Sequence, residues 1–396
     1  MNRPSDRKLR LGVAGLGRAF SLMLPAFTSD PRVHLAAAAD LRPEARQRFV
    51  ADFGGKSYGS VEALCADADI DVVYVATPHQ HHADHTRIAA QHGKSVLVEK
   101  PMALSLDEAA SMVAAAHRAH VHLIVGHSHS FNLPILQTRD HVASGAFGRA
   151  RMITAINYTD FLYRPRRREE FDLATGGGAL FNQAPHQIDI VRVLSGSRVK
   201  SVRAQTGAWD LARPTEGAYS ALLTFEDGSF ASLIYSGYGH FDSDEFEGWI
   251  GEMGDSKQLH SGGRPRLFAD RDDEASFKAA RNYGGPKWDV SPTKHVAHQH
   301  FGTVIVSCER ADLRPTPNGV MIYEHGGARL ESLAPPRISR GEVIDELYAA
   351  IVHGRAPLHD GAWGMATLEV CLAMLRSARE GKEIAVGHRG ECSDRS

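Results

Sequence analysis

Short apolar segments alternate with longer amphipathic stretches in the first part of the chain. Each apolar segment has the length of a buried strand and ends in a polar or glycine-containing turn; the segments are 9–14, 33–39, 70–76, 94–98 and 121–126. The intervening stretches predict one helix starting near Pro43 and another over 105–120, opened by the capping-box-like Ser105-Leu106-Asp107-Glu108. Since strands of a parallel sheet are buried on both faces, this alternation predicts a parallel sheet covered by helices.

The pattern changes from Arg151 onward, where longer segments alternate between apolar and polar residues. The strands predicted there are 152–158, 199–209, 218–225 and 230–235. Such strands are typical of an antiparallel sheet, and a helix from Asn182 to Leu194 would pack on it. Residues 255–292 are polar and rich in Gly, Arg and Asp, and we interpret them as a long excursion without an assigned role.

The first strand leads into a glycine-containing turn and then into a helix. Gly15 would allow the tight turn, and Gly17 would let the backbone approach a pyrophosphate. Arg18, Ala19 and Phe20 open the helix, whose N-terminal N–H groups would bind the phosphates. Phe20 occupies the third glycine position of this motif, so the helix–strand contact there is expected to be looser. Glycines also end strands for structural reasons alone, so the motif needs support from the residues that follow.

An acidic residue supports this interpretation. Asp40 ends the second strand about 20 residues after the turn, where a dinucleotide-binding unit places the carboxylate that binds the adenosine ribose. A carboxylate there repels the 2′-phosphate of NADP, which favours NAD. Arg42 and Arg46 follow closely and would offer a phosphate clamp, so NADP stays possible. The alternative is that Asp40 only caps the helix near Pro43.

Together these segments predict an α/β protein of two domains. The first, 1–127, would be a Rossmann NAD(P)-binding domain. The second, 128–396, would be an α+β domain with a large, mostly antiparallel open sheet that carries the substrate-binding and oligomerisation surfaces. The cleft between the domains should hold the nicotinamide and the substrate.

Composition excludes several classes of protein. The chain has 396 residues, 43% of them hydrophobic, and a formal net charge of -2, which gives no overall attraction to nucleic acid or membranes. It contains no apolar run long enough to span a membrane, and its polar start does not resemble a signal peptide. The cysteines are scattered without CxxC spacing and predict reduced thiols in a cytoplasmic protein: Cys65, Cys308, Cys371 and Cys392.

Two strand ends carry candidate ligand contacts. Thr77 and Pro78 end a strand at the edge where open α/β sheets bind ligands, so they should border the cofactor. A histidine cluster follows at once: His79, His81, His82 and His85. Its spacing would permit metal binding, but no nearby Cys or Glu completes a ligand set, so we predict no metal and expect His79 and His82 to face the cofactor or cap the helix.

The next strand runs into Glu99-Lys100-Pro101. A lysine at this edge, beside a proline that could be cis, is placed to meet a ligand. Glu99 would also lie against the cofactor. The alternative is a surface salt bridge from Glu99.

These segments, in this order, resemble the Gfo/Idh/MocA oxidoreductase family over nearly the whole chain. The matching segments are 12–17, 76–78 with His82, 93–101, 144–148, 176–189, 354–357 and 376–381. The resemblance implies an NAD(P)-dependent oxidoreductase with a catalytic Lys100 and a catalytic His186. It also implies a homodimer or homotetramer formed through the open sheet of the second domain.

The implied pair makes chemical sense. His186 would accept the hydroxyl proton of an alcohol, and the Lys100 ammonium would stabilise the developing alkoxide. The alternative for His186 is packing on Ile190. Asn182 departs from the family, which usually has Asp there; an amide cannot titrate, so we expect Asn182 to orient the substrate.

A second departure is the segment from His127 to Phe131, where many relatives carry an arginine; both departures indicate a substrate unlike a typical sugar. His127, His129 and Tyr238 are secondary candidates for the pocket. The aromatic and basic segment 158–168 begins at Tyr158, and its arginines, Arg164 and Arg166 among them, would bind carboxylates. A solvated charged surface is the alternative for each arginine.

Four segments resemble the branch of this family that contains phthalate dihydrodiol dehydrogenases: 125–131, 158–167, 214–220 and 307–310. That resemblance implies oxidation of a cis-dihydrodiol of phthalate, 4,5-dihydro-4,5-dihydroxyphthalate, to the dihydroxy aromatic acid. A second hypothesis is a dehydrogenase of a polyol or sugar acid. A third, of another class, is a cofactor-sensing protein without catalytic activity.

Overall fold

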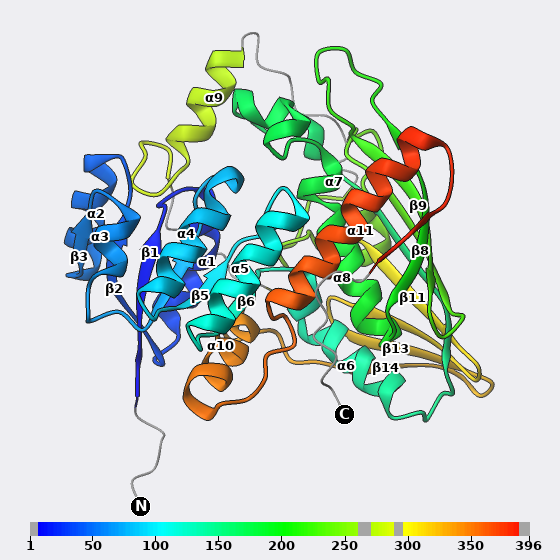
Figure 1. The fold of residues 1–396 in the computed structure, drawn as a ribbon. Helices are drawn as coiled ribbons and strands as arrows, with labels where there is room; N and C mark the ends of the chain where they lie inside the picture. Colours follow the sequence, from blue (N-terminus) through cyan, green and yellow to red (C-terminus); the bar gives the residue numbers. More distant parts are fainter. Residues whose placement is uncertain (1–6, 260–270, 289–295, 388–396) are drawn as a thin grey trace, which may run out of the picture.

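The computed structural model describes residues 7–259, 271–288 and 296–387 and contains two sheets (Figure 1). The first is a six-stranded parallel sheet in the order β3-β2-β1-β4-β5-β6. Its strands are β1 (Leu9–Ala14), β2 (Val33–Ala39), β3 (Lys56–Tyr58), β4 (Val72–Val75), β5 (Ser95–Val98) and β6 (Leu123–Val125). The strand order reverses between β1 and β4. Sheets of this kind bind ligands at such a point, beyond the carboxyl ends of the strands.

Helices cover both faces of this sheet. They are α1 (Arg18–Ser29), α2 (Pro43–Phe53), α3 (Val61–Cys65), α4 (His82–Gln91) and α5 (Leu106–Arg118). The predicted capping is present: Ser105 accepts a hydrogen bond from the Glu108 N–H at the start of α5. A late element, α10 (Gly341–His353), returns to this domain and buries Val343 and Leu347 in the same core as α1.

The second sheet has nine strands in the order β14-β13-β12-β11-β7-β10-β9-β8-β15. Only β7 and β10 pair in parallel; the other pairs are antiparallel. Its strands are β7 (Ala150–Tyr158), β8 (Val199–Gly207), β9 (Ala218–Phe225), β10 (Phe230–Ser236), β11 (Thr303–Cys308), β12 (Asp312–Thr316), β13 (Gly319–Glu324), β14 (Gly327–Ser332) and β15 (Ile384–Ala385). The predicted α/β class with a mostly antiparallel second sheet is confirmed.

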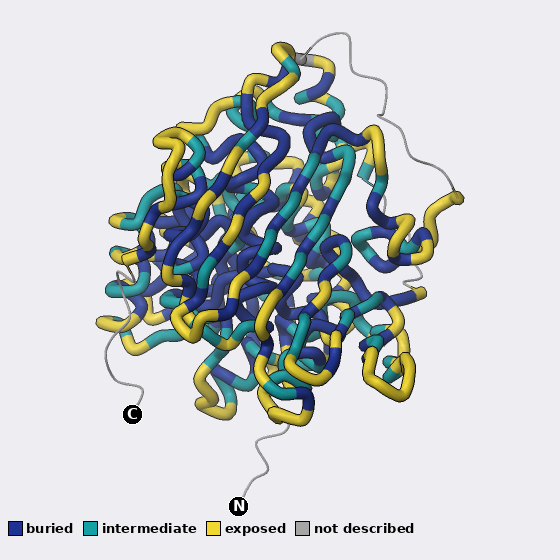
Figure 2. Tube along the Cα trace, turned by 90° about the vertical axis from the view of Figure 1, so that its right-hand side faces the viewer, coloured by how far each residue is buried: buried dark blue, intermediate teal, exposed yellow. Residues whose placement is uncertain are grey.

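Helices lie on the inner face of the second sheet, between it and the first domain (Figure 1). They are α6 (Leu133–Ala143), α7 (Ala179–Asn182), α8 (Ala184–Ser195) and α11 (Gly361–Glu380). The predicted helix over 182–194 is thus interrupted at Gln183 and becomes two helices. On the outer face, buried and more exposed residues alternate along the strands (Figure 2).

Short 3-10 segments and one further helix complete the described chain. The 3-10 segments are η2 (His79–His81), η3 (His129–Phe131), η4 (Phe161–Tyr163), η5 (Arg168–Phe171), η6 (Leu173–Thr175) and η7 (Ser243–Glu247). The excursion over 255–292, described in part, contains α9 (Arg271–Ala280), and its Tyr283 packs fully buried against Phe20 of α1. This excursion therefore joins the two domains.

Cys65, Cys308 and Cys371 are free thiols, whereas Cys392 lies outside the described residues. Within the described ranges, no helix has both the length and the apolar character needed to cross a membrane. The domain boundary after residue 127 stays a prediction.

Candidate active site

A cavity of about 1550 Å³ lies between the domains, at the carboxyl ends of the first sheet. Most of the predicted site residues line it, although they come from many elements. They are Gly15, Gly17, Arg18, Ala19, Asp40, Arg42, Thr77, Pro78, His79, His82, Glu99, Lys100, His127, His129, Arg164, Arg166, Asn182 and His186. A cavity of this size can hold a dinucleotide and a small substrate side by side.

The glycine turn forms one end of this cavity. Gly15 has φ +97°, and a Cβ added there would lie 2.8 Å from the carbonyl oxygen of Ala76, so only glycine fits. Nothing lies within 4 Å of a Cβ built at Gly17, and no side chain caps the α1 helix that starts after it. The backbone N–H groups of the first turn are therefore open to an anion, as a dinucleotide phosphate requires.

Asp40 is held under the same turn. Its Oδ2 accepts a hydrogen bond from the Leu16 N–H at 2.7 Å, and its Oδ1 accepts one from Arg42 Nε at 3.0 Å. Arg42 also donates to the Leu16 carbonyl, and Arg46 to the Asp40 carbonyl. Asp40 is not the side-chain cap of α2, because that helix has none. Contact with a ribose stays a prediction.

The histidine cluster has a structural component. His82 is fully buried, with Nε2 2.8 Å from the Thr77 carbonyl oxygen and Nδ1 2.9 Å from that of Pro101. It therefore joins two loops at the carboxyl edge of the sheet and also lines the cavity, and its contact with the cofactor stays a prediction. His79 and Pro78 line the cavity, and burial lowers the pKa of His79 to about 3.

Lys100 lines the cavity, and the peptide bond to Pro101 is cis. Its Nζ donates a hydrogen bond of 2.6 Å to the backbone carbonyl of Asn182. Burial lowers the pKa of Lys100 to about 8, opposed by the nearby Glu99 carboxylate. Glu99 is in turn held by the Tyr74 hydroxyl at 2.5 Å and is not a surface salt bridge.

The Asn182 side chain does not point its amide N–H groups at a substrate. Its Nδ2 donates to the carbonyl oxygens of Gly176 at 2.9 Å and Gly178 at 2.8 Å. An ionised aspartate could not donate either bond, so the departure from the family pattern has a local structural reason. Asn182 thus holds the carbonyl groups of Gly176 and Gly178 and offers its own backbone carbonyl to Lys100. It also lines the cavity, and its role in orienting the substrate stays a prediction.

A buried carboxyl group, that of Glu216, packs against the end of the glycine segment 176–178. Glu216 Oε1 accepts a hydrogen bond from the Leu180 N–H at 2.9 Å, at the start of α7. A Cβ at Gly178 would lie 2.3 Å from this carboxyl group. Burial raises the pKa of Glu216 to about 7, so this carboxyl group is about half protonated in neutral solution and largely protonated in acid.

His186 lies next to two aromatic neighbours. Its ring is 4.8 Å from the ring of His129 and 4.8 Å from that of Phe301. Burial, aided by the Lys100 charge, lowers the pKa of His186 well below its usual value. Within the described part of the chain, its Nδ1 is buried without a hydrogen-bond partner. His186 is therefore a neutral base at neutral pH.

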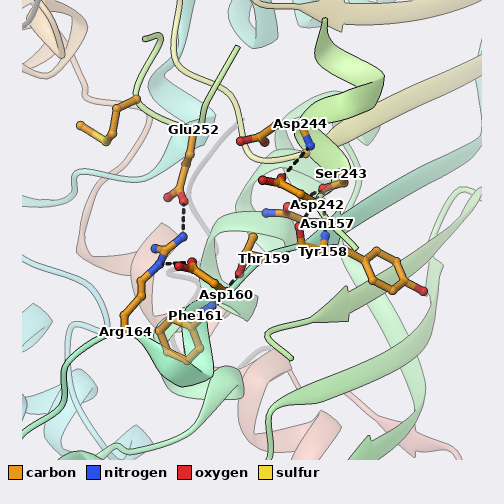
Figure 3. A network of polar contacts seen from close by, with 12 residues as sticks. Asn157, Tyr158, Thr159, Asp160, Phe161, Arg164, Asp242, Ser243, Asp244 and Glu252 are labelled. Atoms are coloured by element: carbon orange, nitrogen blue, oxygen red, sulfur yellow. Dashed lines mark hydrogen bonds and ion pairs between the residues drawn. The ribbon is translucent and has the colours of Figure 1, made fainter. Parts of the chain in front are cut away.

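Figure 3 shows a chain of charged groups made of Glu252, Arg164 and Asp160, and Glu252 also contacts His129. The Glu252 carboxylate lies 3.4 Å from His129 Nε2 and 3.4 Å from the Arg164 guanidinium. Arg164 also donates to Asp160 at 2.8 Å. Despite its burial, the pKa of Glu252 is lowered by these partners. Since Arg164 already has two carboxylate partners, it is poorly suited to bind a third.

Arg166 is buried and has a different environment. Its guanidinium lies 3.6 Å from the centre of the Phe161 ring and donates to the Phe161 carbonyl at 2.5 Å. Its backbone N–H donates to Glu274, which pairs with Arg213. Burial lowers the pKa of Arg166 to about 10, which leaves it charged at neutral pH.

Three predicted site residues do not line the cavity. The predictions for Tyr158 and Tyr238 are wrong for packing reasons, whereas contact of the Phe20 backbone N–H with a phosphate stays a prediction. Phe20 points into the core, where its ring contacts Tyr283. Tyr158 lies on the strand side that faces away from Arg164 (Figure 3). The Tyr238 hydroxyl accepts a hydrogen bond from the Trp209 N–H in a separate buried cluster.

Several residues at the site were missed from the sequence. Glu252 and Arg340 carry no motif and reach the cavity only through the fold, and Phe301 packs against the His186 ring. Lys278, in the excursion, lines the cavity and pairs with Glu170. The charged composition of the excursion was the only available signal. Among the residues that the structure describes, no three His, Cys, Asp or Glu side chains are grouped to hold a metal ion.

Comparison with known proteins agrees with this geometry. The NAD-binding Rossmann-fold model of the Gfo/Idh/MocA oxidoreductase family matches residues 9–127, and the model of the GFO/IDH/MocA C-terminal domain matches residues 135–249. The first match establishes that the glycine turn belongs to an NAD-binding domain.

Individual relatives are also similar. The chain is 46% identical to 1-carboxy-3-chloro-3,4-dihydroxycyclohexa-1,5-diene dehydrogenase of Comamonas testosteroni, over 98% of this chain and 99% of that protein. It is 30% identical to rhizopine catabolism protein MocA of Rhizobium meliloti, over 56% of this chain and 69% of that protein. A solved structure described as a dehydrogenase from Bordetella bronchiseptica RB50 has a TM-score of 0.88 at 42% identity, covering 96% of this chain and 100% of that one. The chain therefore belongs to the Gfo/Idh/MocA family and is an NAD-binding oxidoreductase.

Proposed function

We propose that this protein is an NAD(P)-dependent dehydrogenase that oxidises a cis-dihydrodiol of an aromatic acid, with 4,5-dihydro-4,5-dihydroxyphthalate as substrate. The observation that carries the proposal is the neutral base His186 beside the Lys100 ammonium in a cavity that also contains buried guanidinium groups. The relative from Comamonas testosteroni is named for a ring diol that bears a carboxyl group, which supports this substrate class.

His186 and Lys100 have different roles in the proposed alcohol oxidation. His186 accepts the hydroxyl proton, because its lowered pKa keeps the imidazole unprotonated at neutral pH. The Lys100 ammonium lies near the oxygen and stabilises the negative charge that develops on it. The glycine turn would hold NAD, which would supply a hydride acceptor for the carbon that carries this hydroxyl group. The hydrogen bond from Lys100 to the Asn182 carbonyl keeps the ammonium in place.

The product of this step is a ring ketone beside the second hydroxyl group. Loss of a ring proton and its return to the oxygen gives the aromatic dihydroxy acid. Aromatisation makes the oxidation strongly favourable, so no further protein group is required to drive it. A cavity lined by neutral imidazoles is suited to this proton transfer.

Arg166 supports recognition of an acid. It is charged and buried, it lines the cavity, and no described carboxylate forms an ion pair with it. A carboxylate of the substrate would supply the missing anion. A polyol or sugar acid is the second candidate substrate, since the neutral imidazoles and hydrogen-bonding groups of the cavity also suit hydroxyl groups.

We expect NAD to be preferred over NADP. The Asp40 carboxylate lies in the cavity wall, and Arg42 is already paired with it and with the Leu16 carbonyl. Arg42 is therefore poorly placed to bind a 2′-phosphate, which the carboxylate would repel.

We further propose that the protein is a homodimer or homotetramer formed through the outer face of the nine-stranded sheet. Large apolar side chains are exposed along that face: Met152, Leu222, Phe230, Ile305 and Leu330. An apolar patch on a solvated sheet indicates a protein contact, and a second copy would cover it with the same residues. Light scattering of wild type and Ile305→Asp tests this, with a smaller particle expected for the variant.

The central experiment measures NADH absorbance after mixing the protein with NAD and the phthalate cis-dihydrodiol, with myo-inositol and NADP in parallel. Rapid reduction with the dihydrodiol and formation of a catechol absorbance are expected. Turnover of inositol alone would replace the aromatic acid with a polyol. Absence of reduction with every substrate would favour a cofactor-sensing protein.

A further inference from the structure

Arg340 reaches the cavity from a segment that no sequence motif marks. It precedes α10, where the chain returns from the second sheet to the first domain, and it lines the cavity together with Lys100 and His186. Its backbone is left-handed, with φ 60° and ψ 23°, which is uncommon for a residue other than glycine. Such a conformation persists where surrounding contacts hold it, and it often marks a functional residue.

The guanidinium of Arg340 has weak partners. Its Nε lies 3.4 Å from Gln299 Oε1, and its Nη2 lies 3.7 Å from the Met253 sulfur. No carboxylate in 7–259, 271–288 or 296–387 forms an ion pair with it. A partly buried cation without a paired anion is costly, so a bound anion would stabilise it.

Two other cavity arginines, Arg164 and Arg167, differ from Arg340 in this respect, whereas Arg166, like Arg340, forms no ion pair with a carboxylate of the described residues. Arg164 pairs with Asp160 at 2.8 Å and with Glu252 at 3.4 Å. Arg167 lies 3.3 Å from a carboxylate oxygen of Glu169. The charges of these side chains are therefore already balanced within the protein.

Arg340 lies close enough to Lys100 and His186 for its charge to act on them. After burial, which is the largest cause, its charge contributes to the lowered pKa of Lys100, His127 and His186. These three residues line the substrate end of the cavity. An anion at Arg340 would thus lie close to the base and to the ammonium group.

We propose that Arg340 binds a carboxylate group of the substrate and thereby selects aromatic acids over neutral ring diols. The proposal rests on the proposed function for the substrate class and adds the residue that recognises it. A planar guanidinium suits a carboxylate because two parallel N–H groups match its two oxygens.

The test measures binding by calorimetry to the NADH-saturated protein, using 4,5-dihydroxyphthalate and, as the probe without carboxyl groups, catechol. The variants are Arg340→Gln, Arg340→Lys, which keeps the charge, and Arg337→Gln, an exposed arginine outside the cavity as control. Arg340→Gln should weaken dihydroxyphthalate binding at least about 30-fold, and at least tenfold more than catechol binding. Arg340→Lys should recover part of the loss, and Arg337→Gln should match wild type.

NADH affinity, from protein fluorescence, separates a substrate contact from a cofactor contact. Equal losses for both probes, or a loss of NADH affinity larger than the loss of dihydroxyphthalate affinity, would overturn the proposal. If wild type oxidises the dihydrodiol and Arg340→Gln binds dihydroxyphthalate as tightly as wild type does, only the inference about Arg340 is overturned. Wild type that binds the acid through Arg340 without oxidising the dihydrodiol would overturn only the proposed reaction. Wild type that binds neither probe would overturn both.

Discussion

The two ends of the cavity are built in different ways. The cofactor end is made by backbone groups of the first sheet: the turn at Gly15 and Gly17, and the strand ends at Thr77 and Glu99. The substrate end is made by side chains from segments far apart in the sequence, such as His129, Glu252 and Arg340. Backbone geometry tolerates little change at any one position, whereas side-chain networks tolerate redesign, so one end can stay constant while the other changes its substrate.

The two ends also differ in their charges. At the cofactor end, Asp40 is balanced by Arg42 and by a backbone N–H. At the substrate end, neutral imidazoles and a buried ammonium are held by burial and by Glu252. The first arrangement recognises a fixed ligand, and the second prepares groups for proton transfer.

His186→Ala is expected to give the largest difference between an effect on catalysis at the substrate end and an effect on binding at the cofactor end. Loss of the base should lower kcat about 1000-fold, whereas NADH affinity should stay within about twofold because the glycine turn is untouched. Steady-state kinetics and NADH fluorescence measure the two quantities. His141→Ala, at a partly buried histidine outside the cavity, is the matched control. A comparable loss of NADH affinity in His186→Ala would contradict the separation.

The converse change is Gly15→Ala. The added Cβ would lie 2.8 Å from a backbone carbonyl at a φ of +97°, so the turn must shift. We expect NADH to bind about 100-fold more weakly, measured by fluorescence titration. Gly326→Ala is the control, since a Cβ there meets nothing within 4 Å and the residue does not line the cavity. Unchanged NADH binding in Gly15→Ala would mean that the turn does not hold the cofactor.

Glu216→Gln should change stability with pH. The folded-state pKa of this buried carboxyl is raised to about 7, above its unfolded value, so its contribution is favourable in acid and is lost as the pH rises toward 7 and above. The variant cannot ionise and should gain about 2 kcal/mol relative to wild type between pH 5 and pH 8. Urea unfolding at both pH values measures this. Parallel pH dependence in both proteins would contradict the assignment.

The smallest effect concerns the alkaline side of the pH profile. Lys100 has a pKa of about 8 because it is buried, so it loses its charge as the pH rises above that value. We expect kcat/KM to fall about tenfold per pH unit above pH 8. Lys100→Arg keeps its charge, so its lower activity should not show this decline. A flat wild-type profile up to pH 10 would argue against a charged Lys100 in the reaction.

The sequence by itself determined the parts of this protein that depend on neighbouring residues. The parallel strands, the glycine turn, Asp40 and the capping of α5 follow from short contiguous patterns, because backbone sterics and local hydrogen bonds act over a few residues. Family resemblance added Lys100 and His186, which both line the cavity.

Only the tertiary structure decided which side chains reach the cavity and with what charge. It paired Lys100 with the backbone of Asn182, 82 residues away, and used the Asn182 amide to hold two glycine carbonyls. It turned Phe20 and Tyr238 into their cores and brought Glu252 and Arg340 into the site. These outcomes depend on packing and on electrostatic balance between distant segments, which no local pattern of residues encodes.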